Sequence, residues 1–156
     1  MKIITNLVEV HIFREKGKRL QFLILKRAAK EIYPGLWQMV SGKIKKEEKA
    51  YSAALREMKE ETGLTPVKFW AAPNVNSFYD TSNDSVTIIP VFAALVDTKA
   101  AVKISREHNE FRWVSIEGAK KKLAWEGQRK SVDIISKYYL KQPNFFKVVQ
   151  IPWTQK

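Results

Sequence analysis

The sequence predicts an α/β protein in which a mixed sheet lies between layers of helices. Segments with strand-like patterns stand on both sides of one amphipathic helix, and two further helical segments follow the last strand-like segment. The 156 residues have the length of one domain, and the 45% of apolar residues suffice for one buried core. We therefore expect residues 1–156 to form a single domain.

The chain before the amphipathic helix predicts a β-hairpin and a short strand. Residues 3–13 alternate as a strand does and residues 20–26 are apolar, with a turn at Lys16-Gly17-Lys18 between them. Pro34-Gly35 marks a loop. A short strand over residues 37–41 should then lead into Gly42.

The amphipathic helix is expected over residues 47–62. Glu47 and Glu48 would complement the positive end of the helix dipole, and Gly63 suits the left-handed position that ends a helix. No Ser, Thr, Asp or Asn caps the first turn, so the pattern defines the end of this helix better than its start. One face is apolar and can pack on a sheet: Tyr51, Ala54, Leu55 and Met58.

Downstream, two more strands are expected over residues 66–78 and 85–96, joined by the turn-rich residues 79–84. Pro90 predicts a sheet edge or a bulge, because proline cannot donate to the ladder. Three further elements complete the prediction: a strand over residues 111–115 and helices over residues 116–123 and 128–140.

Three carboxylates lie on one face of the amphipathic helix, within a single turn. They are Glu57, Glu60 and Glu61. Like charges at these spacings destabilise a bare helix, so a cation should lie among them. Oxygen ligands suit Mg²⁺, which binds through a few carboxylates together with substrate phosphates. The alternative from these residues alone is a solvated acidic helix end.

The wider stretch Gly42 to Leu64 reads G-x5-E-x7-R-E-U-x-E-E-x-G-U, where U is apolar. It resembles the Nudix box, with every specified position occupied. The resemblance implies an α/β/α sandwich and hydrolysis of a nucleoside diphosphate linked to another group, with Mg²⁺ or Mn²⁺ required. It also implies a set of metal ligands, namely Glu57, Glu60, Glu61 and the Ser41 carbonyl, and a structural ion pair between Glu48 and Arg56.

Residues 106–113 are the next candidate, on an expected loop that could fold over the metal. The order Glu107-His108, Trp113, Trp125 is similar to Nudix enzymes that act on dihydroneopterin triphosphate or dATP. That likeness makes Glu107 the first choice, and Glu110 the second, for a further ligand or the general base. Glu57 is an alternative base. Two surface charges and an ordinary loop histidine are the other interpretation.

The resemblance implies cleavage of a dNTP, NTP or pterin triphosphate to the monophosphate and pyrophosphate. Hydrolysis of dinucleoside polyphosphates or nucleotide sugars is the alternative, and a non-catalytic nucleotide- or RNA-binding module is another. A base needs an apolar platform and polar groups at its edge. Candidates for the substrate site are Trp37, Gln38, Phe78, Tyr79, Asn76 and Arg27.

Composition excludes some classes of protein. Without cysteine there are no disulfides, zinc-thiolate sites or thiol nucleophiles. No segment resembles a signal peptide or a membrane span, so we expect a cytoplasmic protein without membrane contact. The formal net charge of +12 favours polyanionic ligands, either nucleotides or, less expected, nucleic acid.

The C-terminal stretch from Asn144 to Trp153 carries large apolar side chains. They are Phe145, Phe146, Val148, Val149, Ile151 and Trp153. A free tail of this kind would be an exposed apolar patch, which soluble monomers rarely carry. Either the domain's own sheet or a second copy of the chain should cover it, and the resemblance favours a homodimer.

Overall fold

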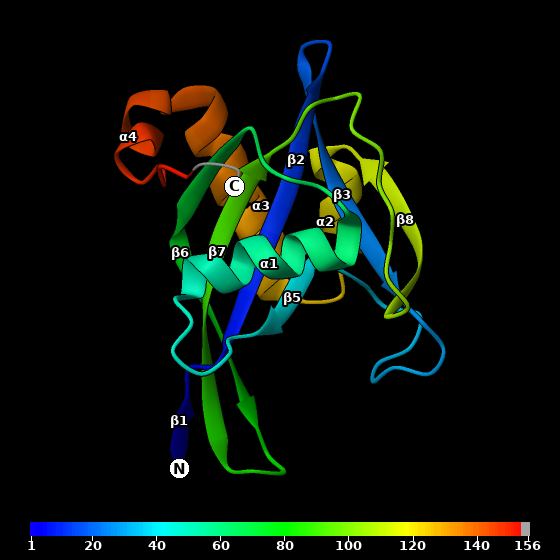
Figure 1. The fold of residues 1–156 in the computed structure, drawn as a ribbon, viewed down its shortest axis with the longest axis vertical. Coiled ribbons are helices and arrows are strands. Elements are labelled where there is room, and N and C mark those ends of the chain that lie inside the picture. The colour runs from blue at the N-terminus through cyan, green and yellow to red at the C-terminus, as the bar shows by residue number, and fades with distance from the viewer. Residues whose placement is uncertain (154–156) are drawn as a thin grey trace.

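The computed structural model describes residues 1–153 and forms the expected α/β/α sandwich (Figure 1). Within that range the sheet contains β1 (Lys2–Ile4), β2 (Leu7–Lys16), β3 (Arg19–Arg27), β4 (Trp37–Gln38), β5 (Val40–Lys43), β6 (Lys68–Asp80), β7 (Ser85–Leu95) and β8 (His108–Val114). Its helices are α1 (Ala50–Thr62), α2 (Ile116–Lys122), α3 (Glu126–Lys141) and α4 (Pro143–Val148).

The sheet is mixed, as predicted. Strand β7 pairs with β6 in the antiparallel sense and with both β1 and β2 in the parallel sense. Strand β2 pairs with β3 and β5, and β3 in turn pairs with β4 and β8, all antiparallel. The predicted hairpin is therefore β2 and β3, and it lies at the centre of the fold.

Apolar side chains along β2 and β3 point alternately to the two faces of the sheet, so each face has a hydrophobic core. Helix α1 lies across one face and helix α3 lies behind the other (Figure 1). The α1 side buries Val8, Val10, Ile12, Leu23 and Leu25 against Ala53, Ala54 and Met58. The other side buries Phe13, Phe22, Ile24 and Met39 against Ala119, Leu123, Val132 and Ile135 of α2 and α3.

Two predicted strands are each divided in the structure. Residues 3–13 belong to β1 and β2, because β1 pairs with the start of β7 and β2 with its later half. Residues 37–41 belong to β4 and β5, which pair with β3 and β2 respectively. The prediction of one continuous strand was wrong in both cases, because the pairing with β7 shifts by one residue between β1 and β2, and the partner strand changes between β4 and β5.

Helix α1 begins at Ala50, not at residue 47. Glu47 has a φ of 64°, in the left-handed region, and Lys49 is extended, so neither is helical. The expected contribution of Glu47 and Glu48 to the first helical turn was therefore wrong. The predicted end is confirmed, because Gly63 has a φ of 73° and its N–H donates to the Lys59 carbonyl.

Pro90 marks a bulge, as one of the two predicted possibilities. It lies opposite Val75 where the pairing of β6 and β7 shifts register. On the other side of β7 the pairing with β1 ends at Thr87 and the pairing with β2 begins at Val91, so Pro90 itself is paired with β6 alone. The residue stands between the part of β7 that pairs with β1 and the part that pairs with β2.

Strand β8 begins at His108, three residues before the predicted start. It pairs with β3 as far as Arg27, with a register shift between Lys26 and Arg27 that lets the pairing continue. Glu110 therefore lies in a strand and not in the expected loop, while Glu107 precedes the strand.

The domain's own sheet covers part of the C-terminal stretch. Phe146 in α4, a helix that the sequence did not predict, is buried and stacks on Trp70 with ring centroids 4.5 Å apart. The chain then runs along β6, where the Ala71 N–H donates to Val149 and the Ile151 N–H donates to Phe69. Phe145 and Val148 remain 66% and 81% exposed, so cover by a second copy, the favoured expectation, stays a prediction for these two residues.

Candidate metal centre

Strand β5 and helix α1 approach each other most closely where Glu57 meets Gly42. A Cβ atom on Gly42 would lie 2.1 Å from the Cδ atom of Glu57, so any side chain at this position would displace the Glu57 carboxylate. Glycine therefore leaves the room that this carboxylate occupies. Burial raises the pKa of Glu57, although hydrogen bonding from Arg56 opposes the effect.

Arg56 joins the segment before α1 to the helix. Its Nε and Nη2 atoms each lie 2.9 Å from an oxygen of Glu48, and Nη2 also donates to the Lys43 carbonyl at 2.8 Å. These hydrogen bonds from Arg56 lower the pKa of Glu48 to about 2. The same guanidinium lies 2.7 Å from Glu57 and 3.3 Å from Glu60, so it also orients two of the clustered carboxylates.

Glu61 is the most unusual charged group of the site. Its side chain is 3% exposed, and neither carboxylate oxygen has a hydrogen-bond partner of normal geometry in residues 1–153. Burial raises the pKa of Glu61 to about 10, and the neighbouring charges of Glu107 and Glu57 add to the effect. The Ser41 backbone lies close enough to oppose it slightly.

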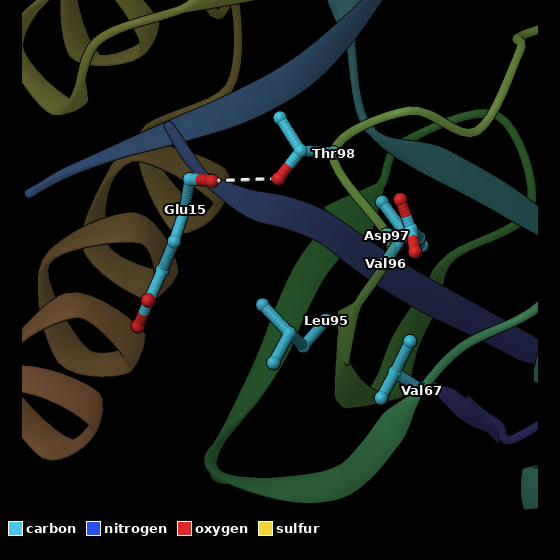
Figure 2. Close-up of a pocket in the computed structure, with 6 residues that line it drawn as sticks. All are labelled: Glu15, Val67, Leu95, Val96, Asp97 and Thr98. Atoms are coloured by element: carbon cyan, nitrogen blue, oxygen red, sulfur yellow. Dashed lines mark hydrogen bonds between the residues drawn. The ribbon is translucent and has the colours of Figure 1, made fainter. Parts of the chain in front are cut away.

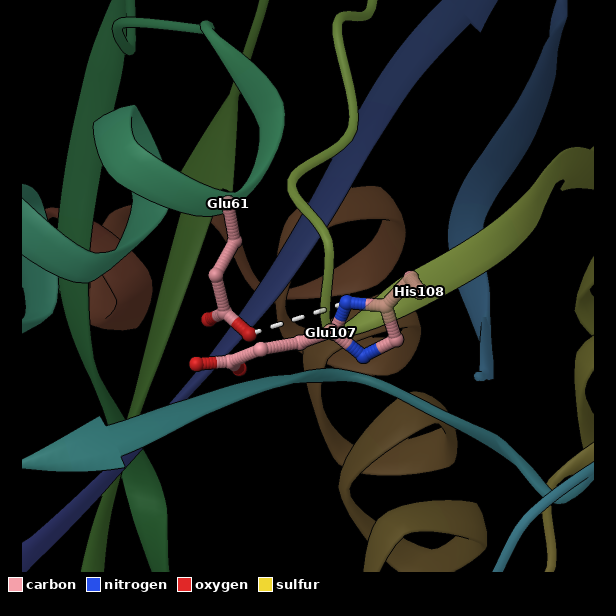
Figure 3. Close-up of side chains that lie close together, drawn as sticks. All are labelled: Glu61, Glu107 and His108. Carbon is pink, nitrogen blue, oxygen red and sulfur yellow. Dashed lines mark ion pairs between the residues drawn. The ribbon is translucent and has the colours of Figure 1, made fainter. Parts of the chain in front are cut away.

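Glu107 and His108 approach Glu61 from the start of β8 (Figure 3). One ligand atom from each of the three residues lies within 4.8 Å of the other two, and His108 Nδ1 is 3.8 Å from Glu61 Oε1. Glu107 is exposed whereas Glu61 and His108 are buried. The group therefore has a buried side and a side that opens to solvent.

Gln38 and Arg27 surround the buried histidine. Nε2 of Gln38 lies 3.2 Å from Nε2 of His108 and can donate to it, which leaves the histidine Nδ1 to carry the proton toward Glu61. Burial lowers the pKa of His108 to about 4, and the charge of Arg27 contributes. The imidazole is therefore neutral at pH 7.

These residues fit a divalent cation. Two carboxylate oxygens that are buried without partners are costly unless a cation or a proton compensates them. Carboxylates suit Mg²⁺ and Mn²⁺, whereas an imidazole ligand is more typical of Zn²⁺ or Fe²⁺. Glu57, Glu61 and Glu107 therefore form the natural oxygen set, with Glu60, whose side chain is 55% exposed, at the rim.

The structure does not bring all predicted site residues to this cluster. Phe78 and Tyr79 are exposed on the β6–β7 hairpin, where the Tyr79 hydroxyl donates to Asp84. Trp37 packs between Arg112 and the core under α2. Glu110 pairs with Arg112 at 2.7 Å.

Sequence reasoning missed a buried polar group on the α3 side of the sheet. Glu9 accepts hydrogen bonds from Asn76 and Gln128 and lies 2.7 Å from His11. Burial by itself would raise the pKa of Glu9, but the hydrogen bond from His11, with those from Gln128 and Asn76, holds it below its ordinary value. The signal in the sequence was two polar residues at alternate positions of an apolar strand.

The surface hollows described next lie away from the carboxylate cluster. One of about 300 Å³ is lined by Glu15, Val67, Leu95, Val96, Asp97 and Thr98 (Figure 2). The Thr98 hydroxyl donates to the Glu15 carbonyl across it at 2.7 Å. None of the predicted site residues lines this hollow, so it does not change the assignment.

Residues 6–133 match the family model described as the NUDIX domain. The chain belongs to the NUDIX family. This Nudix hydrolase contains the complete motif, and its three glutamates are positioned as described above. Within the described part of the chain, none of the helices has the length and apolar character needed to cross a membrane.

One curated relative and several solved structures carry names from the same family. The nucleoside triphosphatase NudI of Klebsiella pneumoniae (strain 342) is 26% identical over 107 residues, which cover 64% of this Nudix chain and 76% of NudI. The MutT protein of Methanosarcina mazei Go1 is 29% identical, with a TM-score of 0.71 over 90% of this chain and 97% of that chain.

Two further similarities support less: one is a likeness of fold, and the other covers a small part of the relative. The E. coli dihydroneopterin triphosphate pyrophosphohydrolase is 20% identical with a TM-score of 0.68, over 85% of this chain and 99% of that chain, which is a likeness of fold. An octanoyltransferase of Myxococcus xanthus is 28% identical over 132 residues, 80% of this chain. The Nudix chain spans only 35% of the length of that relative.

Proposed function

We propose that this Nudix hydrolase, acting as one domain, cleaves a nucleoside triphosphate-like substrate to the monophosphate and pyrophosphate. The substrate would be a dNTP, an NTP or a pterin triphosphate. The observation that carries the proposal is the buried Glu61 carboxylate, whose oxygens lack partners in residues 1–153, with a Glu107 oxygen within 4.8 Å and the charge of Glu57 near enough to raise the pKa of Glu61. The names of NudI and of the pterin triphosphate enzyme support a triphosphate substrate.

Glu57, Glu61 and Glu107 would hold Mg²⁺, with Mn²⁺ as a substitute, and the Ser41 backbone lies beside them. A divalent cation there would neutralise phosphate oxygens and acidify an attacking water. Arg56 holds Glu57 in place, while the side chain of Glu60 remains at the solvent edge.

The roles of the glutamates follow from their exposure. Glu61 is enclosed, so its role is to hold the cation and not to activate water. Glu107 is exposed on the segment before β8 and can accept a proton from a water approaching the phosphate. Arg27, which is close enough to affect the pKa of His108, is positioned to meet a phosphate of the substrate.

A panel of nucleotides with Mg²⁺ tests the proposal. Purified protein is incubated with dNTPs, NTPs, dihydroneopterin triphosphate, dinucleoside polyphosphates and nucleotide sugars, and the products are identified by ³¹P NMR. Pyrophosphate together with a monophosphate supports the proposal. Release of inorganic phosphate alone, or turnover only of the last two classes, would replace it with another hydrolysis, and no turnover at all would favour a binding module.

Substitutions test the role proposed for each glutamate. We expect Glu57→Gln and Glu61→Gln each to lower kcat at least about 100-fold without unfolding the protein, because each removes a metal-binding charge. Glu107→Ala should lower kcat more than it raises KM. Glu110→Ala is the matched control, since Glu110 pairs with Arg112 outside the cluster. A larger loss in the Glu110 variant than in the Glu107 variant would move the role to Glu110.

A further inference from the structure

The hairpin of β6 and β7 projects beyond the rest of the fold, with β1 beside it (Figure 1). Residues 69–79 of β6 and residues 85–96, which include most of β7, contain no Asp, Glu, Lys or Arg, in a chain with 28 basic and 16 acidic residues. Buried strands normally lack charge, but the end of β6 is not buried: Val75 is 60% exposed, Phe78 50% and Tyr79 54%. This end of the hairpin is therefore an uncharged and partly apolar surface that faces solvent.

The register of the strands determines which backbone groups of β6 point outward. The Lys2 N–H donates to the Asp84 carbonyl, so the pairing with β1 uses the backbone groups of residues 84, 86 and 88. Since the direction alternates along a strand, residues 85, 87 and 89 of β7 point toward β6 and pair with residues 80, 78 and 76. The N–H and C=O groups of Val75, Ser77 and Tyr79 therefore point away from β7.

Within residues 1–153, no strand pairs with this outer edge. Strand β6 pairs with β7, and the C-terminal segment bonds to the outer edge at Phe69 and Ala71, before the hairpin projects. The Ser77 N–H donates to the side chain of its neighbour, Asn76. Proteins usually block a free edge with Lys, Pro or a bulge, and residues 76–79 contain none of the three. The edge is thus open to a further strand.

We propose that residues 75–79 form the interface of a homodimer, in which β6 pairs antiparallel with β6 of a second copy about a two-fold axis at Ser77. Two identical strands in this arrangement are self-complementary, as a two-fold interface requires. Ser77 then exchanges both backbone hydrogen bonds with Ser77 of the second copy, and Val75 does so with Tyr79 of the second copy. One continuous sheet runs through both subunits.

Charge and side chains both favour a second copy at this edge. Each copy carries a formal net charge of +12, so most approaches bring like charges together, whereas residues 75–79 carry no charge. On one face of the joined sheet, Val75 lies opposite Tyr79 of the second copy, and an aromatic ring with a β-branched side chain is a favourable cross-strand pair. The interface lies at the other end of the fold from α4 (Figure 1), so it is separate from the C-terminal stretch.

A cross-link tests the register directly, because the chain contains no cysteine of its own. The Cα atoms of a hydrogen-bonded antiparallel pair lie about 5.5 Å apart, within the range that a disulfide spans. We expect Ser77→Cys to give a covalent dimer, at twice the chain mass of 18.1 kDa, on mild oxidation or with a short bismaleimide. Ser82→Cys, in the turn of the same hairpin, is the matched control, because its two copies would lie about 34 Å apart.

Equal cross-linking of the two cysteine variants would show random collision and overturn the proposal. The absence of a covalent dimer of Ser77→Cys with both reagents would also overturn it.

Light scattering measures the assembly without a cross-link. We expect wild-type protein at about 100 µM to have twice the chain mass, and Val75→Lys to weaken the dimer at least about 10-fold, because a lysine on an edge strand opposes pairing. Val67→Lys is the matched control, since Val67 is 61% exposed and directly precedes β6. Circular dichroism confirms that both variants are folded. A monomeric wild type, or a dimer that Val75→Lys leaves intact, would overturn the proposal.

Salt dependence provides a second test of the same interface. An uncharged edge between two copies of high positive charge should pair more tightly as salt screens their repulsion. We therefore expect the fraction of dimer to rise between about 50 and about 500 mM NaCl, whereas a dimer held by ion pairs would dissociate. A fall in the fraction of dimer would contradict the proposal. None of these measurements uses a nucleotide, so their outcome is independent of the proposed hydrolysis.

Discussion

At the scale of single residues, Glu61 shows how this site is built. Its carboxylate is enclosed beside Glu107 and near Glu57, and the protein offers it no donor of normal geometry in residues 1–153. A neutral imidazole, His108, is the nearest ring. In the metal-free protein this buried carboxyl therefore keeps its proton near pH 7, and a bound cation would take the place of that proton.

This arrangement predicts a pH-dependent stability for the metal-free protein. The pKa of Glu61 is raised to about 10 in the folded state, so the unfolded state loses this proton first as the pH rises. Stability should therefore fall above the unfolded pKa of about 4.5, and by roughly 3 kcal/mol between about pH 7 and pH 9. Urea unfolding in EDTA at the two pH values measures the change.

Glu61→Gln should remove this dependence, whereas Glu110→Gln should retain it. His108 does not interfere in this range, because its pKa is lowered to about 4 and its effect is confined to pH below about 6.5. Saturating Mg²⁺ should flatten the wild-type curve, since the cation replaces the proton. Equal slopes in the wild type and the Glu61 variant would show that another group causes the effect.

At the scale of elements, the C-terminal segment extends the sheet without being a strand of it. It pairs with the free side of β6 through Val149 and Ile151, and α4 places Phe146 against Trp70. The aromatic core continues from there through Phe13 to Phe22. The segment therefore protects the edge of β6 and completes the core on the α3 side.

Phe146→Ala should destabilise the protein by roughly 3–5 kcal/mol, because it leaves a cavity beside Trp70. Phe145→Ala is the matched control, since Phe145 is 66% exposed and should change little. Urea unfolding followed by Trp fluorescence measures both. A small effect at Phe146, together with a change of mass in light scattering, would instead point to cover by a second copy. The expected homodimer remains a prediction.

At the scale of the whole molecule, net charge is the dominant property. The formal charge of +12 surrounds a site that is itself acidic. Basic residues flank the entry to α1, among them Lys43, Lys45, Lys46 and Lys49. A polyanionic substrate is attracted over long range by such a field, and salt screens the attraction.

Raising the salt concentration from about 50 to about 200 mM should therefore lower kcat/KM several-fold, roughly 3- to 10-fold, with little change in kcat. Initial rates at several concentrations of the preferred nucleotide measure both parameters. Lys45→Gln combined with Lys46→Gln should reduce the salt dependence. A salt effect on kcat alone would show that the charges act on the chemical step or on product release, and not on encounter.

Features that depend on residues close together in the chain could be predicted from the sequence alone. The spacing of Glu57, Glu60 and Glu61 places them on one helical face, and Gly63 ends that helix, because both follow from local geometry. The mixed sheet, the β2–β3 hairpin and the complete motif were predictable for the same reason. Glu107 was found by likeness to a family pattern, and the structure places it beside Glu61.

Contacts between segments that are distant in the sequence became known only from the tertiary structure. Gln38 meets His108 across 70 positions of the chain, and Tyr33 meets Trp125 across 92 positions. The strand break at residues 5–6 accompanies a shift of one residue in the pairing with β7, and the break at Met39 accompanies a change of partner from β3 to β2. The tail lies on β6 because that edge was free and apolar. Such contacts leave no local pattern in the sequence, so they can be identified only in the folded chain.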